Sequence, residues 1–251
     1  MNLAVCLKRV PDTTTKLKIG PDGKSIDHQG VEWAISPYDE LAIELALRLK
    51  EKAGGEVVGI TVDPDGSDVA MRKALAIGLD KGVLIKGGGN FDGWATAQIL
   101  ASVLKARKFD VIFFGKQAID TDAFQVPTMV AHQLGLPRVN VCTTFEVDGG
   151  KARCKRQIEG GEESIEVSLP CVISVQKGVN GIHDKRFPSM KGIMAAKTKP
   201  VETVAAPAME SSMEVVKLEM PPERPPGRIV GRGIEAVPEL VRLLKEEAKV
   251  L

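Results

Sequence analysis

The sequence predicts an α/β protein with a doubly wound, mostly parallel sheet, an added antiparallel meander and a C-terminal helical arm. Over residues 1–135, short apolar runs alternate with segments whose apolar residues repeat every three or four positions. Such alternation favours parallel strands joined by crossover helices on both faces of one sheet. Beyond residue 138 the pattern changes to strand-like segments separated by glycine turns, which predicts a meander added to that sheet.

The alternating part supplies four predicted strands and four predicted helices. We expect strands at 3–9, 56–62, 82–86 and 110–114, and helices at 36–52, 68–77, 92–107 and 125–134. The clearest helix start is Ser36-Pro37-Tyr38-Asp39, with serine as the N-cap, proline at the first helical position and an acid in the first turn. The continuous apolar run 111–114 is typical of a strand buried on both faces.

The second half of the chain is predicted to contain a meander and then less regular structure. Meander strands are expected at 139–147, 151–157 and 164–169, with turns at 148–150 and 160–161, followed by a core strand at 171–176. Residues 177–199 are rich in Gly, Lys and Arg without a clear period, which predicts a functional loop or disorder.

We therefore divide the chain into a nucleotide- or flavin-binding α/β domain over 1–200, a Pro-rich linker over 201–233 and a helical arm over 234–251. The arm contains an amphipathic helix over 237–251 with Leu240, Val241 and Leu244 on its apolar face. A lone helix at the end of a tether has no obvious core to join, so we expect it to dock on a partner subunit. The alternative is that it packs back on its own domain.

Composition narrows the class of protein. In 251 residues, 43% hydrophobic content is enough for a sizeable core, and a formal charge of +1 gives no broad attraction for nucleic acid. The sequence has no apolar run long enough to span a membrane, and we expect a cytoplasmic protein without membrane insertion. Its cysteines lack Cys-x-x-Cys spacing and its histidines lie far apart, so we expect buried free thiols and no metal site.

The stretch from Val111 to Pro127 is the leading candidate for a ligand site, because it has the order strand, polar loop, helix. Such a loop lies beyond the carboxyl end of a strand, where the next helix offers backbone N–H groups to a phosphate. Asp120 and Asp122 lack a nearby histidine or nucleophile, so we expect them to shape and cap the turn and we assign no catalytic residue. The Gly-rich run 87–90 completes no phosphate-binding motif and is interpreted as a turn.

Four stretches together resemble one known family. The loop Gly115-Lys116-Gln117-Ala118-Ile119-Asp120-Thr121-Asp122, with Gln125, closely resembles the signature loop of the electron-transfer flavoprotein beta subunit. Residues 6–10 are similar to its first strand, 36–42 to its first helix start and 186–197 to its partner-recognition loop. The resemblance runs in the same order over essentially the whole chain.

This resemblance implies an adenine nucleotide alpha-hydrolase-like fold that pairs with an alpha subunit holding a redox-active FAD. It also implies an adenine nucleotide bound in this chain. Matched residue by residue, the cofactor-binding positions implied are Cys6, Ser36, Val62, Gly115, Asp122, Gln125, Val126 and Thr128.

The same resemblance implies a docking segment over 177–199. Met190 matches the apolar anchor that enters an acyl-CoA dehydrogenase or a similar flavin dehydrogenase, and Arg186, Lys191 and Ile193 flank it as partner-binding residues. The basic side chains in this segment, namely Lys185, Arg186, Lys191 and Lys197, would steer it toward an acidic surface.

The family has two branches, and the nucleotide distinguishes them. Plain carriers bind AMP in the beta subunit, whereas bifurcating and nitrogen-fixation-associated members bind a second FAD and split electron pairs from NADH. Residues 10–13, 37–39 and 186–189 resemble the bifurcating branch, which we favour, while Ser36, Phe124, Pro127 and residues 180–184 depart from the family pattern. The alternatives are a carrier with structural AMP and a nucleotide-binding module without a redox role; a nucleotide hydrolase is disfavoured because no Walker loop is present.

Overall fold

A computed structural model of the protein describes residues 1–63, 67–87, 91–223 and 226–251. Within these ranges the main feature is a nine-stranded sheet with the order β11-β5-β4-β1-β6-β10-β7-β8-β9. Its strands are β1 (Asn2–Cys6), β4 (Glu56–Asp63), β5 (Lys81–Lys86), β6 (Val111–Gly115), β7 (Arg138–Asp148), β8 (Lys151–Ile158), β9 (Gly161–Ser168), β10 (Cys171–Val175) and β11 (Val201–Ala205). All neighbours from β11 to β7 are parallel, and β8 and β9 continue antiparallel. The predicted mostly parallel sheet with an added meander is confirmed.

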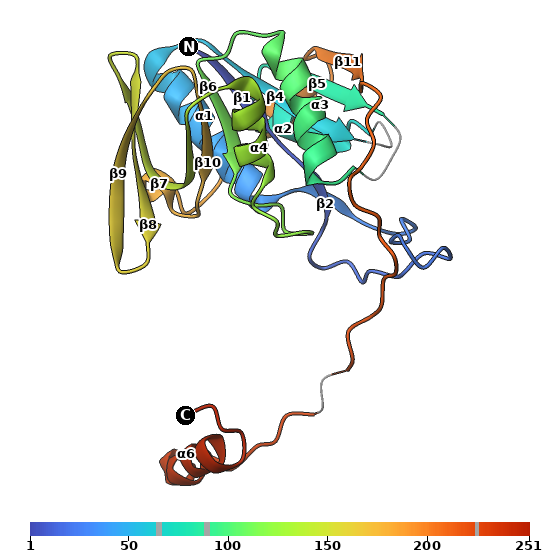
Figure 1. Cartoon of the computed structure of the whole chain (residues 1–251), viewed down its shortest axis with the longest axis vertical. Helices are drawn as coiled ribbons and strands as arrows, with labels where there is room; N and C mark the ends of the chain where they lie inside the picture. Colours follow the sequence, from blue (N-terminus) through green and yellow to red (C-terminus); the bar gives the residue numbers. More distant parts are fainter. Residues whose placement is uncertain (64–66, 88–90, 224–225) are drawn as a thin grey trace.

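Helices cover both faces of this sheet (Figure 1). They are α1 (Pro37–Ala53), α2 (Val69–Ile77), α3 (Gly93–Lys105) and α4 (Val126–Leu134). Alternate strand residues point to opposite faces, so Leu3 and Val5 join the core under α1 and α2, whereas Ala4 and Cys6 join the core under α3 and α4. The double winding is therefore confirmed by two separate apolar clusters.

The point where the winding reverses lies between β1 and β6. The chain builds outward from β1 through β4 to β5, then returns to place β6 and β10 on the other side of β1. In open α/β sheets, ligands bind outside the carboxyl ends of the strands at such a switch point. This edge carries the end of β1 at Cys6 and the end of β6 at Gly115.

The meander shares its core with the parallel strands. Its turns contain Gly149, Gly150 and Gly160 at positive φ, as tight hairpins require. Phe145 on β7 meets Phe113 on β6 edge to face, with ring centroids 5.2 Å apart. Cys6, Cys142, Cys154 and Cys171 are all buried and unbridged, which confirms the expectation of free thiols.

The structure corrects three sequence-based expectations about local structure. Ser36 occupies the N-cap position of α1, but its side chain makes no capping bond and instead donates to the Gln117 carbonyl oxygen. The strand predicted over 3–9 is split, because Arg9–Pro11 (β2) turns away and pairs antiparallel with Trp33–Ile35 (β3) in a small second sheet. The loop predicted over 177–199 contains the 3-10 turn η1 (Val179–Gly181) and the helix α5 (Met190–Ala196).

The linker begins later than the predicted residue 201. Val201–Ala205 forms β11, which pairs in parallel with β5 at the edge of the sheet. The following segment is also attached, because Asp92 Oδ2 accepts the backbone N–H groups of Ser212 and Met213 at 2.6 and 3.0 Å. Further along, Lys24 forms an ion pair with Glu214 at 2.8 Å.

The chain ends in an arm that leaves the α/β domain (Figure 1). It consists of the 3-10 turn η2 (Ile234–Ala236) and the helix α6 (Val237–Glu246), which is shorter than the predicted 237–251. All of α6 is described, and none of its residues is buried. The helix therefore does not pack back on its own domain. Residues 64–66, most of the Gly-rich run 87–90 and residues 224–225 of the Pro-rich linker lie outside the described residues.

Candidate functional site

The candidate site is built where the carboxyl ends of β1 and β6 meet the start of α1. Asp39, in the first turn of α1, is buried and bridges both strand ends. Its Oδ1 accepts the backbone N–H of Gly115 at 2.9 Å, and its Oδ2 accepts the backbone N–H of Lys8 at 2.8 Å. Burial raises the pKa of Asp39 to about 7, although these N–H groups favour the charged form.

Gly115 permits this close approach because it has no side chain. A Cβ atom at this position would lie 2.5 Å from Asp39 Oδ1 and 2.6 Å from the carbonyl carbon of Tyr38. Both distances are shorter than any normal contact, so a larger residue would push the loop away from α1. Glycine therefore sets the geometry of the strand end.

The loop after Gly115 is shaped by polar contacts, and its carboxylates do not work as a pair. Asp120 forms an ion pair with Lys8 at 2.7 Å, which closes the loop over the end of β1. Asp122, at φ 48°, accepts a hydrogen bond from the side-chain amide of Gln117. Neither aspartate caps α4, whose N-cap residue is Gln125, so the expected capping role is wrong while the turn-shaping role is confirmed.

An aromatic rim lies beside the same loop. The Lys116 ammonium is 5.0 Å from the centroid of the Tyr38 ring and 5.2 Å from that of the exposed Phe124 ring. Both distances fall within the range of cation–π attraction. Phe124 adopts φ 59°, so the loop holds this aromatic side chain at the rim with an unusual backbone conformation.

The first turn of α4 has the features of an anion site. Its N-cap residue, Gln125, makes no side-chain capping bond, so the leading N–H groups of the helix lack that partner. Thr128 accepts a hydrogen bond from Asn140 Nδ2 at 2.7 Å, which fixes the hydroxyl. Gln117 Oε1 is buried without a hydrogen-bond partner among the described residues. These groups fit the phosphate and polar parts of a nucleotide.

The structure places the sequence-predicted cofactor residues along this one edge. Cys6, Val62 and Gly115 lie at or near the carboxyl ends of three adjacent parallel strands. The remaining positions are on the adjoining loop and helix starts, namely Ser36, Asp122, Gln125, Val126 and Thr128. The Cys6 thiol points into the core, where burial and then the Asp39 carboxylate raise its pKa, so we expect this residue to contribute its backbone.

Sequence reasoning missed several polar residues that organise the site. The sequence pattern indicates only a first-turn acid at Asp39 and predicts no role for Lys8, Gln117 or Asn140. A polar residue directly after a predicted strand is the available signal for Lys8 and Gln117. Asn140 offered no such signal, because it lies on β7 and reaches the start of α4 only through the fold.

The predicted docking segment presents an apolar surface on α5. Ser189 caps the helix by accepting the Gly192 N–H at 3.0 Å, and Met190 is 77% exposed. The exposed apolar side chains here form what we call the docking patch, consisting of Phe187, Met190, Ile193 and Met194. Gly192 packs so closely on α2 that a Cβ atom would lie 2.3 Å from the Ala76 carbonyl oxygen. The patch is thus carried by a helix fixed to the domain.

The predicted partner-binding cations differ in their surroundings. Arg186 is bonded to Glu44 and Glu51 on α1, and Lys185 is bonded to Glu40. Lys191 is exposed and, within the described chain, has no ion-pair partner.

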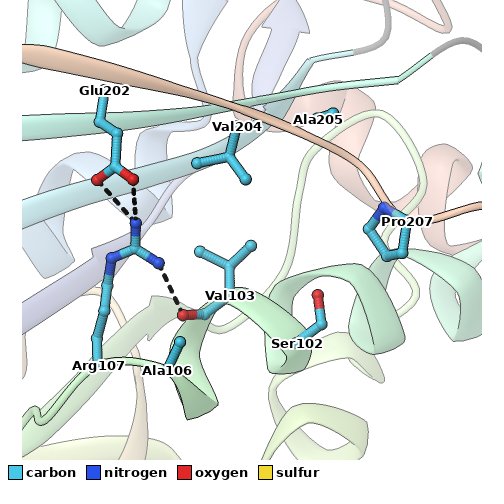
Figure 2. A pocket seen from close by; sticks show the side chains of 8 residues that line it. All are labelled: Ser102, Val103, Ala106, Arg107, Glu202, Val204, Ala205 and Pro207. Carbon is cyan, nitrogen blue, oxygen red and sulfur yellow. Dashed lines mark hydrogen bonds and ion pairs between the residues drawn. The ribbon is translucent and has the colours of Figure 1, made fainter.

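An open groove of about 650 Å³ lies apart from both regions, between α3 and β11 (Figure 2). Arg107 crosses one end, where it bonds both carboxylate oxygens of Glu202 at 2.7 Å and donates to the Val103 carbonyl at 2.9 Å. These polar groups satisfy one another, and the sequence-predicted site residues are not among those that line the groove.

The fold and the site together define a doubly wound α/β protein with a candidate ligand site at its topological switch point. Residues 24–209 match the family described as "Electron transfer flavoprotein domain". The electron transfer flavoprotein subunit beta of Syntrophomonas wolfei is 44% identical over 241 residues, covering 96% of this chain and 92% of the relative. That of Bacillus subtilis is 37% identical and covers 100% of both chains; that of Mus musculus is 32% identical and covers 98% and 97%. The chain belongs to the electron transfer flavoprotein family and corresponds to its beta subunit.

The family resemblance found in the sequence is therefore confirmed over the whole chain. Across the described ranges, the helices are all too short or too polar to cross a membrane. The same residues contain no cluster of His, Cys, Asp and Glu suited to a metal ion.

Proposed function

We propose that this beta subunit holds an adenine nucleotide at the switch point between β1 and β6 and works as half of a heterodimer with an FAD-bearing alpha subunit. The observation that carries the proposal is the start of α4, which lacks a side-chain cap and follows the loop that Asp39 fixes through Gly115. Backbone N–H groups at such a position bind phosphate oxygens.

Each part of the site has a distinct task in this proposal. The N–H groups of Val126 and Thr128 hold phosphate, and Gln117 supplies a buried polar oxygen to the nucleotide. Gly115 and Asp39 fix the loop, and the Lys8–Asp120 ion pair closes it. The bound flavin supplies the electron chemistry, so the side chains provide position and electrostatics and none is catalytic.

We favour FAD as the nucleotide, so that the heterodimer carries two flavins and bifurcates electrons from NADH. The similarity of residues 10–13, 37–39 and 186–189 to the bifurcating branch supports this choice. The alternative is a carrier with structural AMP, which the same helix N-terminus would hold by its phosphate. We also propose a cytoplasmic location, with which the unbridged thiols agree.

The nucleotide content of the purified heterodimer tests these proposals. The beta chain is produced with its alpha partner, the complex is denatured, and released FAD and AMP are quantified per heterodimer. Two FAD molecules support the bifurcating form, and one FAD with one AMP supports the plain carrier. Absence of any nucleotide beyond the FAD of the alpha subunit would overturn the proposed site.

We further propose that the docking patch delivers electrons to or from an acyl-CoA dehydrogenase or a similar flavin dehydrogenase. Met190 is the anchor, because a flexible thioether side chain adapts to an apolar cavity. The test is electron transfer with Met190→Ala, compared with Met213→Ala as a control. Met213 is 74% exposed, close to the 77% of Met190, but lies outside the patch. Equal transfer by both variants with every dehydrogenase would remove the anchor role.

A further inference from the structure

Arg186 stands immediately before the docking patch, yet its guanidinium points back to α1. Its Nε donates to Glu44 Oε2 at 2.7 Å, and its Nη1 donates to Glu51 Oε1 at 2.7 Å. Nη2 adds longer bonds to Glu44 Oε1 and Glu51 Oε2, at 3.2 and 3.3 Å. Every nitrogen of the guanidinium is thus directed at a carboxylate of its own subunit.

Glu44 places one partner of this contact in the interior of the protein. The residue is only 3% exposed, and it also accepts a bond from Arg48 Nε at 2.7 Å. Burial alone would raise the pKa of Glu44, but bonds from Arg186 and Arg48 outweigh it and lower that pKa. Without Arg186, this nearly buried carboxylate would lose its main partner, which is costly.

The residue before Arg186 makes the same kind of contact. Lys185 is bonded to Glu40, one turn earlier on α1 than Glu44. The two cations therefore fasten the chain to successive turns of α1 just before it enters the docking patch. On the far side of the patch, Arg72 on α2 donates to the carbonyl oxygens of Ala196 and Lys199 at 2.8 and 3.0 Å. The patch is held at both ends.

We propose that Arg186 is a positioning residue, which fixes the docking patch on α1, and that it does not itself contact the acidic surface of the dehydrogenase. This inference rests on the proposed docking function and changes the role that the resemblance implies for Arg186. Attraction of an acidic partner then falls to Lys191 and Lys197, which are exposed and lack an ion-pair partner within the described chain.

The helix α1 gives this arrangement a further consequence. Asp39 at its start holds the loops of the nucleotide site, and Glu44 and Glu51 farther along hold Arg186. One rigid element thus sets the position of both the nucleotide loop and the docking patch. The spacing between the proposed nucleotide and the docked dehydrogenase therefore depends on α1.

A double-mutant cycle on the heterodimer tests the proposal. The variants are Arg186→Gln, Glu44→Gln and both together, and the measurements are kcat and the KM of an acyl-CoA dehydrogenase for the heterodimer. If Arg186 positions the patch, each single variant raises KM by about tenfold with kcat unchanged, and the double variant is no worse than either. Amide hydrogen exchange over residues 187–196 rises in all three.

The opposite pattern would overturn the proposal. If Arg186 contacts the dehydrogenase directly, Arg186→Gln raises KM while Glu44→Gln leaves it unchanged or lowers it, and exchange over 187–196 stays at the wild-type level. Glu51→Gln provides a milder variant should Glu44→Gln fail to fold, because Glu51 has a 58% exposed side chain. We expect Glu51→Gln to raise both the KM and the amide hydrogen exchange over 187–196, each by a smaller factor than Glu44→Gln does.

Lys191→Gln is the matched control for charge. It removes one cation from the segment without removing an ion pair. The KM of this variant should therefore exceed that of wild type at low salt and approach it at high salt, while amide hydrogen exchange over residues 187–196 stays unchanged. Failure of the docking function itself is recognised separately, because Met190→Ala would then leave KM unaltered. The exchange measurement decides the positioning role in either case.

Discussion

Asp39 Oδ1 accepts a hydrogen bond from the backbone N–H of Gly115 across 2.9 Å, which joins the first turn of α1 to the end of β6. The other carboxylate oxygen accepts the N–H of Lys8 at the end of β1. A single buried side chain thus holds together the two strand ends between which the nucleotide is proposed to lie.

The first prediction concerns the pH dependence of stability. Because the pKa of Asp39 rises from 3.8 to about 7 on folding, the folded protein keeps a proton that the unfolded chain releases between these values. The resulting stabilisation is complete below about pH 4 and is lost as the pH rises through about 7. This difference in pKa corresponds to the order of 4 kcal/mol.

Asp39→Asn removes this titration. We expect the difference in unfolding free energy between wild type and variant to decrease from pH 4 to pH 7 and to stay flat above pH 8. Urea unfolding of the purified chain at a series of pH values measures it. Two curves that run parallel over this range would show that Asp39 does not titrate there.

The second prediction concerns the space around Gly115. Gly115→Ala should destabilise the chain by about 1–3 kcal/mol, because its Cβ atom would meet Asp39 and the backbone of Tyr38. It should also weaken nucleotide retention by displacing the loop. The control is Gly161→Ala, where an added Cβ would meet no atom within 4 Å. Thermal unfolding and nucleotide content measure both effects, and equal results for the two variants would contradict the prediction.

The parallel sheet and the meander could be predicted because their signals are local. Each of these signals lies within a few consecutive residues: an apolar run such as 111–114, a helical period, or paired glycines at a hairpin turn. Gly149 and Gly150 adopt the positive φ that their pattern indicates. The order of strand, polar loop and helix around Gly115 could also be predicted, because these three segments follow one another in the sequence.

The remaining elements depend on contacts between distant parts of the chain. Val201–Ala205 has a weak alternation beside prolines, and only pairing with β5 makes it a strand. The seven residues of α5 are too few to show a helical period, and its place is fixed by Gly192 against α2. Likewise, Arg186 resembles a docking cation in sequence until Glu44 and Glu51 on α1 are seen to bind it.

The third prediction concerns Asp92, which caps α3 and also holds the segment after β11. Its Oδ1 accepts the Ala95 N–H at 2.8 Å, while its Oδ2 accepts those of Ser212 and Met213. In Asp92→Ser, the serine hydroxyl can still cap α3, but this shorter side chain cannot also accept the N–H groups of Ser212 and Met213. We expect nearly wild-type thermal stability with faster amide exchange at 211–214.

Asp92→Ala is the companion variant. It loses both sets of bonds, so we expect the same faster exchange plus a loss of about 1 kcal/mol in stability. The hydrogen bond from the Ala95 N–H lowers the pKa of Asp92. In wild type we therefore expect the segment to stay attached at every pH above the ordinary pKa of a carboxyl group, and to loosen as the pH falls through the lowered pKa of Asp92. Unchanged exchange at 211–214 in both variants would show that Asp92 does not hold the segment.

The fourth prediction concerns α6, in which none of the residues is buried. Leu240 is 43% exposed on the apolar face of this helix, together with Val237 and Val241. Since a free apolar face is stabilised only by a partner, Leu240→Asp should weaken the heterodimer by roughly 30-fold, or about 2 kcal/mol. The stability of the isolated beta chain should not change, because α6 contributes no buried residue to its core.

Glu246→Gln, on the polar face of the same helix, is the control and should leave the heterodimer within about twofold of wild type. Sedimentation of the complex at several concentrations gives the dissociation constant, and thermal unfolding of the isolated chain gives its stability. If Leu240→Asp lowered that stability while leaving the dissociation constant unchanged, the arm would pack within its own subunit in solution. If both variants weakened the complex equally, charge on α6 would matter more than its apolar face.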